Sequence, residues 1–227
     1  MRLEKYLVKC GLGSRREIKN FVTSGRIKVD GIVVLDEGEN IDEINGIITF
    51  DDNSIKEKEM KYYIMNKKAG YITAMVDERH QTVTELLPDW VEKQALFPVG
   101  RLDKDTEGLL LFTNDGDLNY HMTHPERKFT KKYYADLRND LSDEDIEKIE
   151  SGIDIGTHLC LPAKIEKIND RAVYITIHEG KFHQVKRMFR AVNNRVVYLK
   201  RVEFGNLNLG TMELGDVIEI QRGDIEI

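Results

Sequence analysis

The chain has 227 residues, of which 41% are hydrophobic and 33% are charged, so it can bury a core and has room for one or two domains. Its formal net charge of -6 argues, taken alone, against binding to nucleic-acid phosphates. No long uncharged apolar stretch, no secretion signal at the start and only two distant cysteines are present, so we expect a cytoplasmic protein without a disulfide framework.

Two segments depart from this acidic average. Residues 1–30 carry eight Lys and Arg against three acidic residues, and residues 180–201 carry seven Lys and Arg with no acidic residue. An anionic ligand responds to the local field rather than to the net charge, so both segments are candidates for RNA contact. A run of basic residues can also be only a solvated surface, so further motifs are needed to distinguish an RNA contact from such a surface.

The N-terminal segment predicts two helices and a hairpin. Apolar residues on one face predict a helix over 2–10, and the capping box Ser14-Arg15-Arg16-Glu17 predicts a second helix over 15–23. Residues 26–29 alternate as a strand, and Asp30-Gly31 is a two-residue hairpin signal before 32–34.

This order and spacing resemble the S4 RNA-binding module, in Leu3-x-x-Tyr6-Leu7, Ser14-Arg15-Arg16 and Gly25-Arg26-Ile27-x-Val29-Asp30-Gly31. The alternative is a small helical cap whose arginines are merely solvated. If the module binds RNA, we expect contacts from the basic side chains Arg15, Arg16, Lys19, Arg26 and Lys28. The charged segment 53–61 has little apolar periodicity and is expected to be the linker, which gives domains at 1–57 and 58–227.

In the larger domain, strands are expected over 62–66, 71–73, 109–112 and 199–205, with helices over 82–87 and 186–191. Segment 100–108 is a glycine-bounded loop before the buried strand 109–112, and such anchored loops often carry function. Asp103, Asp105 and Gly108 match an EF-hand opening, but Asn114 at the twelfth position and the following strand argue against calcium. His121-x-x-His124 lacks further zinc ligands, so no metal is expected.

The loop Gly100-Arg101-Leu102-Asp103-x-Asp105-Thr106-x-Gly108-Leu109-Leu110-Leu111 resembles the signature of the pseudouridine synthases, and more narrowly the RsuA family of bacterial ribosomal-RNA enzymes. Three companion blocks follow the order of that family: 66–70, 131–133 and 179–188. Lys68 stands where the family usually has proline, and we expect this to alter a turn near the site. The resemblance implies an α+β fold, with the S4-like module followed by a larger mixed, mainly antiparallel sheet domain that is catalytic.

The resemblance also implies roles for three residues: Asp103 as essential carboxylate, Tyr133 as the aromatic that stacks on the target base and takes a proton, and Lys186 as the cation beside Asp103. A carboxylate can attack the sugar or abstract a proton from it, and a nearby cation keeps it ionised. Without the resemblance, Asp103 reads as a turn-former and Tyr133 as an ordinary strand tyrosine. Further RNA contacts are expected from Arg101, Lys131, Lys181 and Arg187, although Arg101 could equally form a structural ion pair, and His183 is interpreted as structural.

The predicted reaction is the isomerisation of one uridine in ribosomal RNA to pseudouridine, without a cofactor. Lys131-x-Tyr133 and a chain that ends at Ile227 without a basic tail favour the small-subunit (16S) branch over the 23S branches. The expected partner is ribosomal RNA within a partly assembled small subunit, and the enzyme is expected to be a monomer away from membranes. A non-catalytic RNA-binding assembly factor that has kept the scaffold is the alternative from a different class.

Overall fold

The computed structural model describes residues 1–93 and 95–226. Its contacts divide the chain into two compact units, Met1–Lys61 with Glu92–Leu96, and Tyr62–Val91 with Phe97–Ile227. The segment 92–96 rejoins the first unit after the chain has entered the second. Such a long-range return leaves no local pattern in the sequence, and the expected single crossing near residue 58 did not include it.

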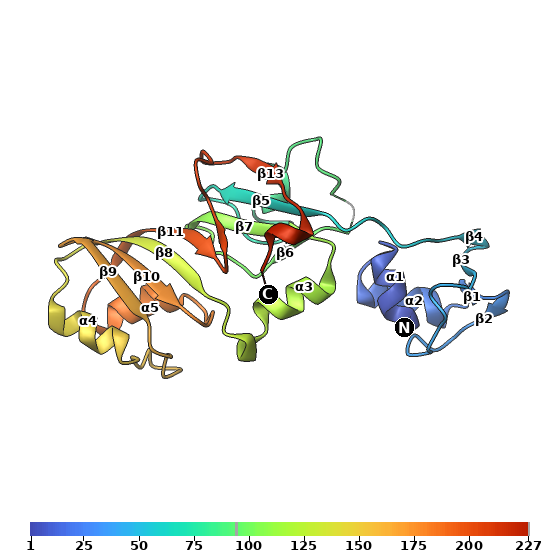
Figure 1. Ribbon diagram of the computed structural model, residues 1–227, viewed down its shortest axis with the longest axis horizontal. Helices are drawn as coiled ribbons and strands as arrows, with labels where there is room; N and C mark the ends of the chain where they lie inside the picture. Colours follow the sequence, from blue (N-terminus) through green and yellow to red (C-terminus); the bar gives the residue numbers. More distant parts are fainter. Residues whose placement is uncertain (94, 227) are drawn as a thin grey trace. The chain divides into compact units, whose positions relative to one another are not determined.

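The first unit packs two helices on a four-stranded antiparallel sheet with the strand order β2-β1-β3-β4 (Figure 1). Its elements are α1 (Leu3–Lys9), α2 (Arg15–Thr23), β1 (Ile27–Val29), β2 (Ile32–Val33), β3 (Ile48–Phe50) and β4 (Asn53–Ser54). The predicted capping box is present, since the Glu17 amide donates to the Ser14 hydroxyl and the Glu17 carboxylate accepts from the Ser14 amide. The predicted hairpin turns at Asp30 and Gly31, whose φ angles are 51° and 81°.

The second unit is built on a nine-stranded sheet with the order β13-β5-β7-β11-β8-β10-β9, in which β12 pairs with β11 and β6 with β7. Every pairing in it is antiparallel except that of β7 with β11, so the predicted mixed, mainly antiparallel sheet is confirmed. The strands are β5 (Tyr62–Lys67), β6 (Phe97–Val99), β7 (Glu107–Thr113), β8 (Lys131–Leu137), β9 (Lys164–Asn169), β10 (Ala172–Ile177), β11 (Val196–Phe204), β12 (Leu207–Asn208) and β13 (Val217–Glu219).

Strands β5 and β7 form the centre of this core, since every residue of β5 and all but the first of β7 are buried. Three helices pack on the sheet: α3 (Gly116–Thr123) against β6, α4 (Asp143–Glu150) against β9, and α5 (Gln184–Ala191) against β11 (Figure 1). Short 3-10 turns complete the unit at Val83–Leu86, Pro125–Arg127 and Arg222–Asp224. The helix expected over 186–191 is α5, which begins two residues earlier than expected, directly after His183.

Two expectations about local structure were wrong. The strand expected over 71–73 is reduced to one bridge between Ile72 and Thr82, and the helix expected over 82–87 is a single 3-10 turn. For the strand the reason is tertiary, because Thr73 uses its hydroxyl to support the neighbouring loop. That hydroxyl donates to the Leu102 carbonyl at 2.8 Å and accepts from the Leu102 amide at 3.0 Å.

Candidate active site

The loop that carries Asp103 connects β6 to β7 and is held at both ends by glycine. Gly100 has a φ of 70° and Gly108 a φ of 104°, a region that other residues rarely adopt. A Cβ at Gly108 would collide with the backbone of Arg201 in β11. Glycine is thus required where β7 and β11 approach, and this approach fixes where the loop ends.

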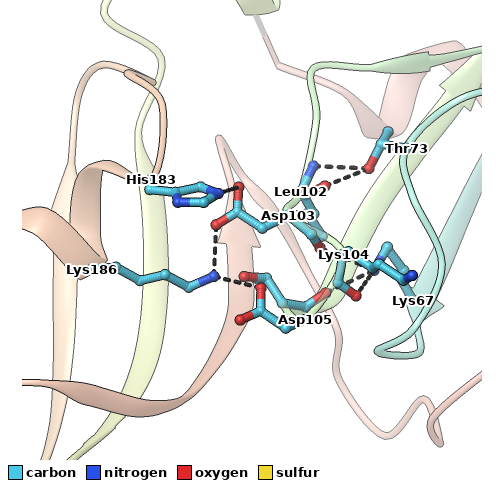
Figure 2. Close-up of polar contacts among 9 residues, drawn as sticks. Lys67, Thr73, Leu102, Asp103, Lys104, Asp105, His183 and Lys186 are labelled. Carbon is cyan, nitrogen blue, oxygen red and sulfur yellow. Dashed lines mark hydrogen bonds and ion pairs between the residues drawn. The ribbon is translucent and has the colours of Figure 1, made fainter.

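A buried lysine holds the middle of the same loop. The Lys67 side chain is fully buried at the end of β5, and its ammonium donates to the carbonyls of Lys68 at 3.0 Å and Thr106 at 2.9 Å. Longer contacts reach the carbonyls of Asp103 at 3.3 Å and Lys104 at 3.4 Å (Figure 2). Burial lowers the pKa of Lys67 to about 8, against the pull of nearby carboxylates. The Lys67 ammonium therefore ties the backbone of the loop to the buried end of β5.

The carboxylate of Asp103 lies between the Lys186 ammonium and the His183 imidazole, both at the start of α5. Lys186 Nζ donates to Asp103 Oδ2 at 2.8 Å and to Asp105 Oδ1 at 2.6 Å, and His183 Nε2 lies 3.6 Å from Asp103 Oδ1 (Figure 2). Burial opposes the charge of Lys186, but the bonds to both aspartates outweigh it and raise its pKa. Burial likewise works against Asp105, yet Lys186 lowers the pKa of that carboxyl.

A cavity of about 630 Å³ opens beside Asp103. Tyr133 of β8 and Arg201 of β11 line it, with Lys131 and Phe204 nearby and with Phe182 and His183 stacked at 3.8 Å between ring centroids. The structure thus brings two of the three residues expected to be catalytic, Asp103 and Tyr133, to one cavity, and the third, Lys186, is bonded to Asp103. A space of this size suits a ligand as large as a nucleoside.

The basic residues expected to contact RNA in this unit have different surroundings. Arg101 and Lys181 are exposed and line the cavity. Lys131 also lines it, but its ammonium donates to the Phe129 carbonyl, and burial lowers its pKa to about 8. Arg187 donates to the carbonyl of Ile155, which gives it a structural contact.

The basic side chains expected to contact RNA in the first unit mostly face carboxylates. Arg26 pairs with Asp51, and the other pairs are Lys28 with Asp52, Lys19 with Glu37, and Arg15 with Glu4. Exposed pairs of this kind contribute little to stability, at about 0–1 kcal/mol, and can exchange partners. RNA contact by these residues thus remains a prediction.

Several residues of the site carried no usable signal in the sequence. His183 was interpreted as structural, although it lies beside Asp103, and Lys67, Thr73 and Arg201 act through burial and tertiary contacts. Only the repetition of Asp at 103 and 105 could have indicated that Lys186 bridges two carboxylates. Among the described residues, no cluster of three or more His, Cys, Asp or Glu could hold a metal ion, and no helix has the length and apolar character to cross a membrane.

Comparison with known proteins identifies the family. The RNA pseudouridylate synthase model matches residues 61–191 and the S4 domain model residues 1–43. The Bacillus subtilis RNA pseudouridine synthase YtzG is 43% identical, covering 92% of this chain and 90% of its own. The ribosomal small subunit pseudouridine synthase A of Vibrio cholerae is 36% identical (95% and 94%), and the ribosomal large subunit pseudouridine synthase B of Bacillus subtilis is 33% identical (99% and 94%).

A solved structure agrees with this assignment over both units. A crystal structure of a pseudouridylate synthase aligns with a TM-score of 0.71 and 28% identity, covering 99% of this chain and 97% of that one. The family model spans more than half of the chain, and relatives above 30% identity cover nearly all of it. The chain is therefore an enzyme that belongs to the RNA pseudouridylate synthase family, with an S4 domain at its N-terminal end.

Proposed function

We propose that this enzyme isomerises a specific uridine of ribosomal RNA, in the small subunit (16S), to pseudouridine, with Asp103 as the essential group and without a cofactor. The observation that carries this proposal is the Asp103 carboxylate held beside a cavity by Lys186, with His183 Nε2 3.6 Å from its other oxygen. The reaction breaks the N-glycosidic bond, turns the base and rejoins it through carbon.

Asp103 has the surroundings that such a reaction needs. A carboxylate can attack the sugar or remove a proton from it, and the Lys186 ammonium at 2.8 Å supplies a fixed positive charge beside it. The loop backbone is anchored by Lys67 and Thr73, so the carboxylate keeps its place when the cavity is filled.

Tyr133 supports the part of the proposal that concerns the base. It lines the same cavity from β8 and is only 8% exposed, so a base that enters would meet its ring. A base taken out of an RNA helix loses its stacking neighbours, and an aromatic ring returns about 1–3 kcal/mol. The oxygen of Tyr133 is also a group that can take a proton from the base, once the hydroxyl has given its own proton to solvent.

Relatives support ribosomal RNA as the substrate. The names of two relatives specify the ribosomal small and large subunits, at 36% and 33% identity. Lys131-x-Tyr133 favours the small subunit, and the large-subunit relative makes 23S RNA the second candidate. We further propose that a partly assembled small subunit is the form of RNA that is modified, by a monomer in the cytoplasm.

The experiment is pseudouridine mapping of ribosomal RNA from cells that lack this protein, complemented with wild type or Asp103→Asn. One site lost in the deletion and restored only by wild type supports the proposal, and its position distinguishes 16S from 23S. Purified enzyme should stay active after exhaustive chelation. An unchanged map, or full restoration by Asp103→Asn, would instead favour a non-catalytic assembly factor or a different RNA.

A further inference from the structure

Arg201 is a buried cation without a carboxylate partner among the described residues. Its side chain is 1% exposed, its Nε donates to the Leu109 carbonyl at 2.8 Å, and its guanidinium lies 4.6 Å from the centre of the Phe204 ring. Its Nη2 has no hydrogen-bond partner of standard geometry in the same part of the chain. A buried charge of this kind destabilises the fold unless something accepts its free N–H groups. Packing alone gives no reason for a guanidinium here.

Arg201 and Tyr133 are direct neighbours on adjacent strands. The two residues are register partners on the adjacent antiparallel strands β11 and β8, so their side chains lie on the same face of the sheet. Both line the cavity beside Asp103. Burial lowers the pKa of Arg201, and the charge and hydrogen-bonding interaction with Tyr133 opposes that shift. The register, the shared cavity and this interaction together make the Tyr133 hydroxyl the candidate acceptor for the unused N–H group.

We propose that Arg201 is a positioning residue that acts through Tyr133, by donating its free Nη2–H to the Tyr133 hydroxyl oxygen. This inference rests on the proposed function of Tyr133. A donor with a full charge fixes the direction of the hydroxyl and stabilises negative charge on that oxygen. When the hydroxyl has given its own proton to solvent, the oxygen carries a negative charge that the guanidinium stabilises, and it can then take the proton from the base and become a hydroxyl again.

The charges around Tyr133 agree with this role. Lys131, two residues earlier in β8, lines the same cavity. Burial is the larger cause of its lowered pKa, and the positive charge of Arg201 is the smaller one. Glu179 opposes that shift but is itself held by His158, Gln184 and the Leu161 amide. Tyr133 therefore shares the cavity with two basic side chains, Arg201 and Lys131.

A kinetic experiment tests the proposal through a double-mutant cycle. The single-turnover rate would be followed by release of tritium from [5-³H]uridine RNA at saturating enzyme, for Arg201→Met and Arg201→Lys in wild-type and Tyr133→Phe backgrounds. We expect Arg201→Met to slow the reaction at least tenfold with RNA affinity unchanged, Arg201→Lys to recover part of the rate, and the loss to vanish in Tyr133→Phe. An equal loss in both backgrounds would overturn the proposal.

A measurement without substrate separates this inference from the proposed function. The chain has nine tyrosines, and ¹³Cζ-labelled tyrosine gives one NMR signal for each, with Tyr133→Phe identifying the signal of Tyr133. Arg201→Lys and Arg201→Met should move that signal, whereas Arg195→Met, at an exposed arginine before β11, should leave it in place. An unmoved Tyr133 signal in Arg201→Lys contradicts the contact even if Arg201→Met fails to fold. A moved signal with an unchanged uridine map would leave the contact standing and refute the function instead.

Discussion

Replacing Lys67 with Met would remove the ammonium that holds the Asp103 loop, while keeping a side chain of similar length in the core. Two of its contacts are short, to Lys68 O at 3.0 Å and Thr106 O at 2.9 Å. A hydrogen bond from a charged donor contributes about 1.5–3 kcal/mol, and the removal of a buried charge offsets part of the sum. We therefore expect a loss of about 3 kcal/mol in the free energy of unfolding.

This loss should appear in both stability and activity. For a domain of this size, about 3 kcal/mol corresponds to a fall in the melting temperature of about 6–12 °C. A displacement of Asp103 by about 1 Å would slow the chemistry about 100-fold. Thermal unfolding and single-turnover tritium release measure the two effects. Lys68→Met is the matched control, because the exposed Lys68 side chain makes none of these loop contacts.

The pH dependence of stability gives the same prediction an independent check. Lys67 has a folded-state pKa of about 8, against 10.5 for an ordinary lysine, so the unfolded chain binds more protons between these values. The stability that this group contributes therefore rises with pH from about 8 towards 10.5 and is lost as pH falls through 8. The difference in stability between wild type and Lys67→Met should grow over that window. A melting temperature of Lys67→Met within 2 °C of wild type, with unchanged activity, would refute the reasoning.

Two further predictions concern the backbone and the RNA surface. Gly108→Ala should destabilise the protein by about 3 kcal/mol or more, because the added Cβ would collide with the Arg201 backbone at a residue whose φ is 104°. The control is Gly116→Ala, since the space around a Cβ at Gly116 is open. Equal melting temperatures for the two variants would contradict the prediction. A triple alanine variant of Arg15, Arg16 and Arg26 should bind a ribosomal RNA fragment more weakly than wild type. The slope of log affinity against log salt concentration should fall by about 0.7–0.9 for each lost phosphate contact. Equal affinity would exclude these residues as RNA contacts.

The parts of the fold that the sequence predicted well are those set by local chemistry. The capping box at Ser14 and Glu17 and the turn at Asp30-Gly31 need only neighbouring residues, so their patterns are sufficient. Tyr71–Thr73 has strand-like composition, but the Thr73 hydroxyl is used by Leu102, which no local pattern can show. The class of the larger sheet followed from the resemblance rather than from periodicity.

Only those site residues that belong to a recognisable motif could be predicted from the sequence. The resemblance paired Lys186 with Asp103 across more than eighty positions, and the structure places their charged atoms 2.8 Å apart. Lys67 and Arg201 were missed as site residues, because a buried cation is recognised by what surrounds it in space. His183 lies beside Asp103 with a left-handed backbone at the start of α5, at a φ of 50°, and composition reveals neither feature.

The parallel pairing of β7 with β11 joins two half-sheets along a short seam, and the side chains around Asp103 come from both halves. Only two residue pairs are in register there, Lys200 with Glu107 and Arg201 with Gly108. Side chains reinforce the join, since Tyr198 donates to Glu107 at 2.6 Å and Lys186 reaches Asp103 across it. The bond between Lys186 and Asp103 is thus also a link between the two half-sheets.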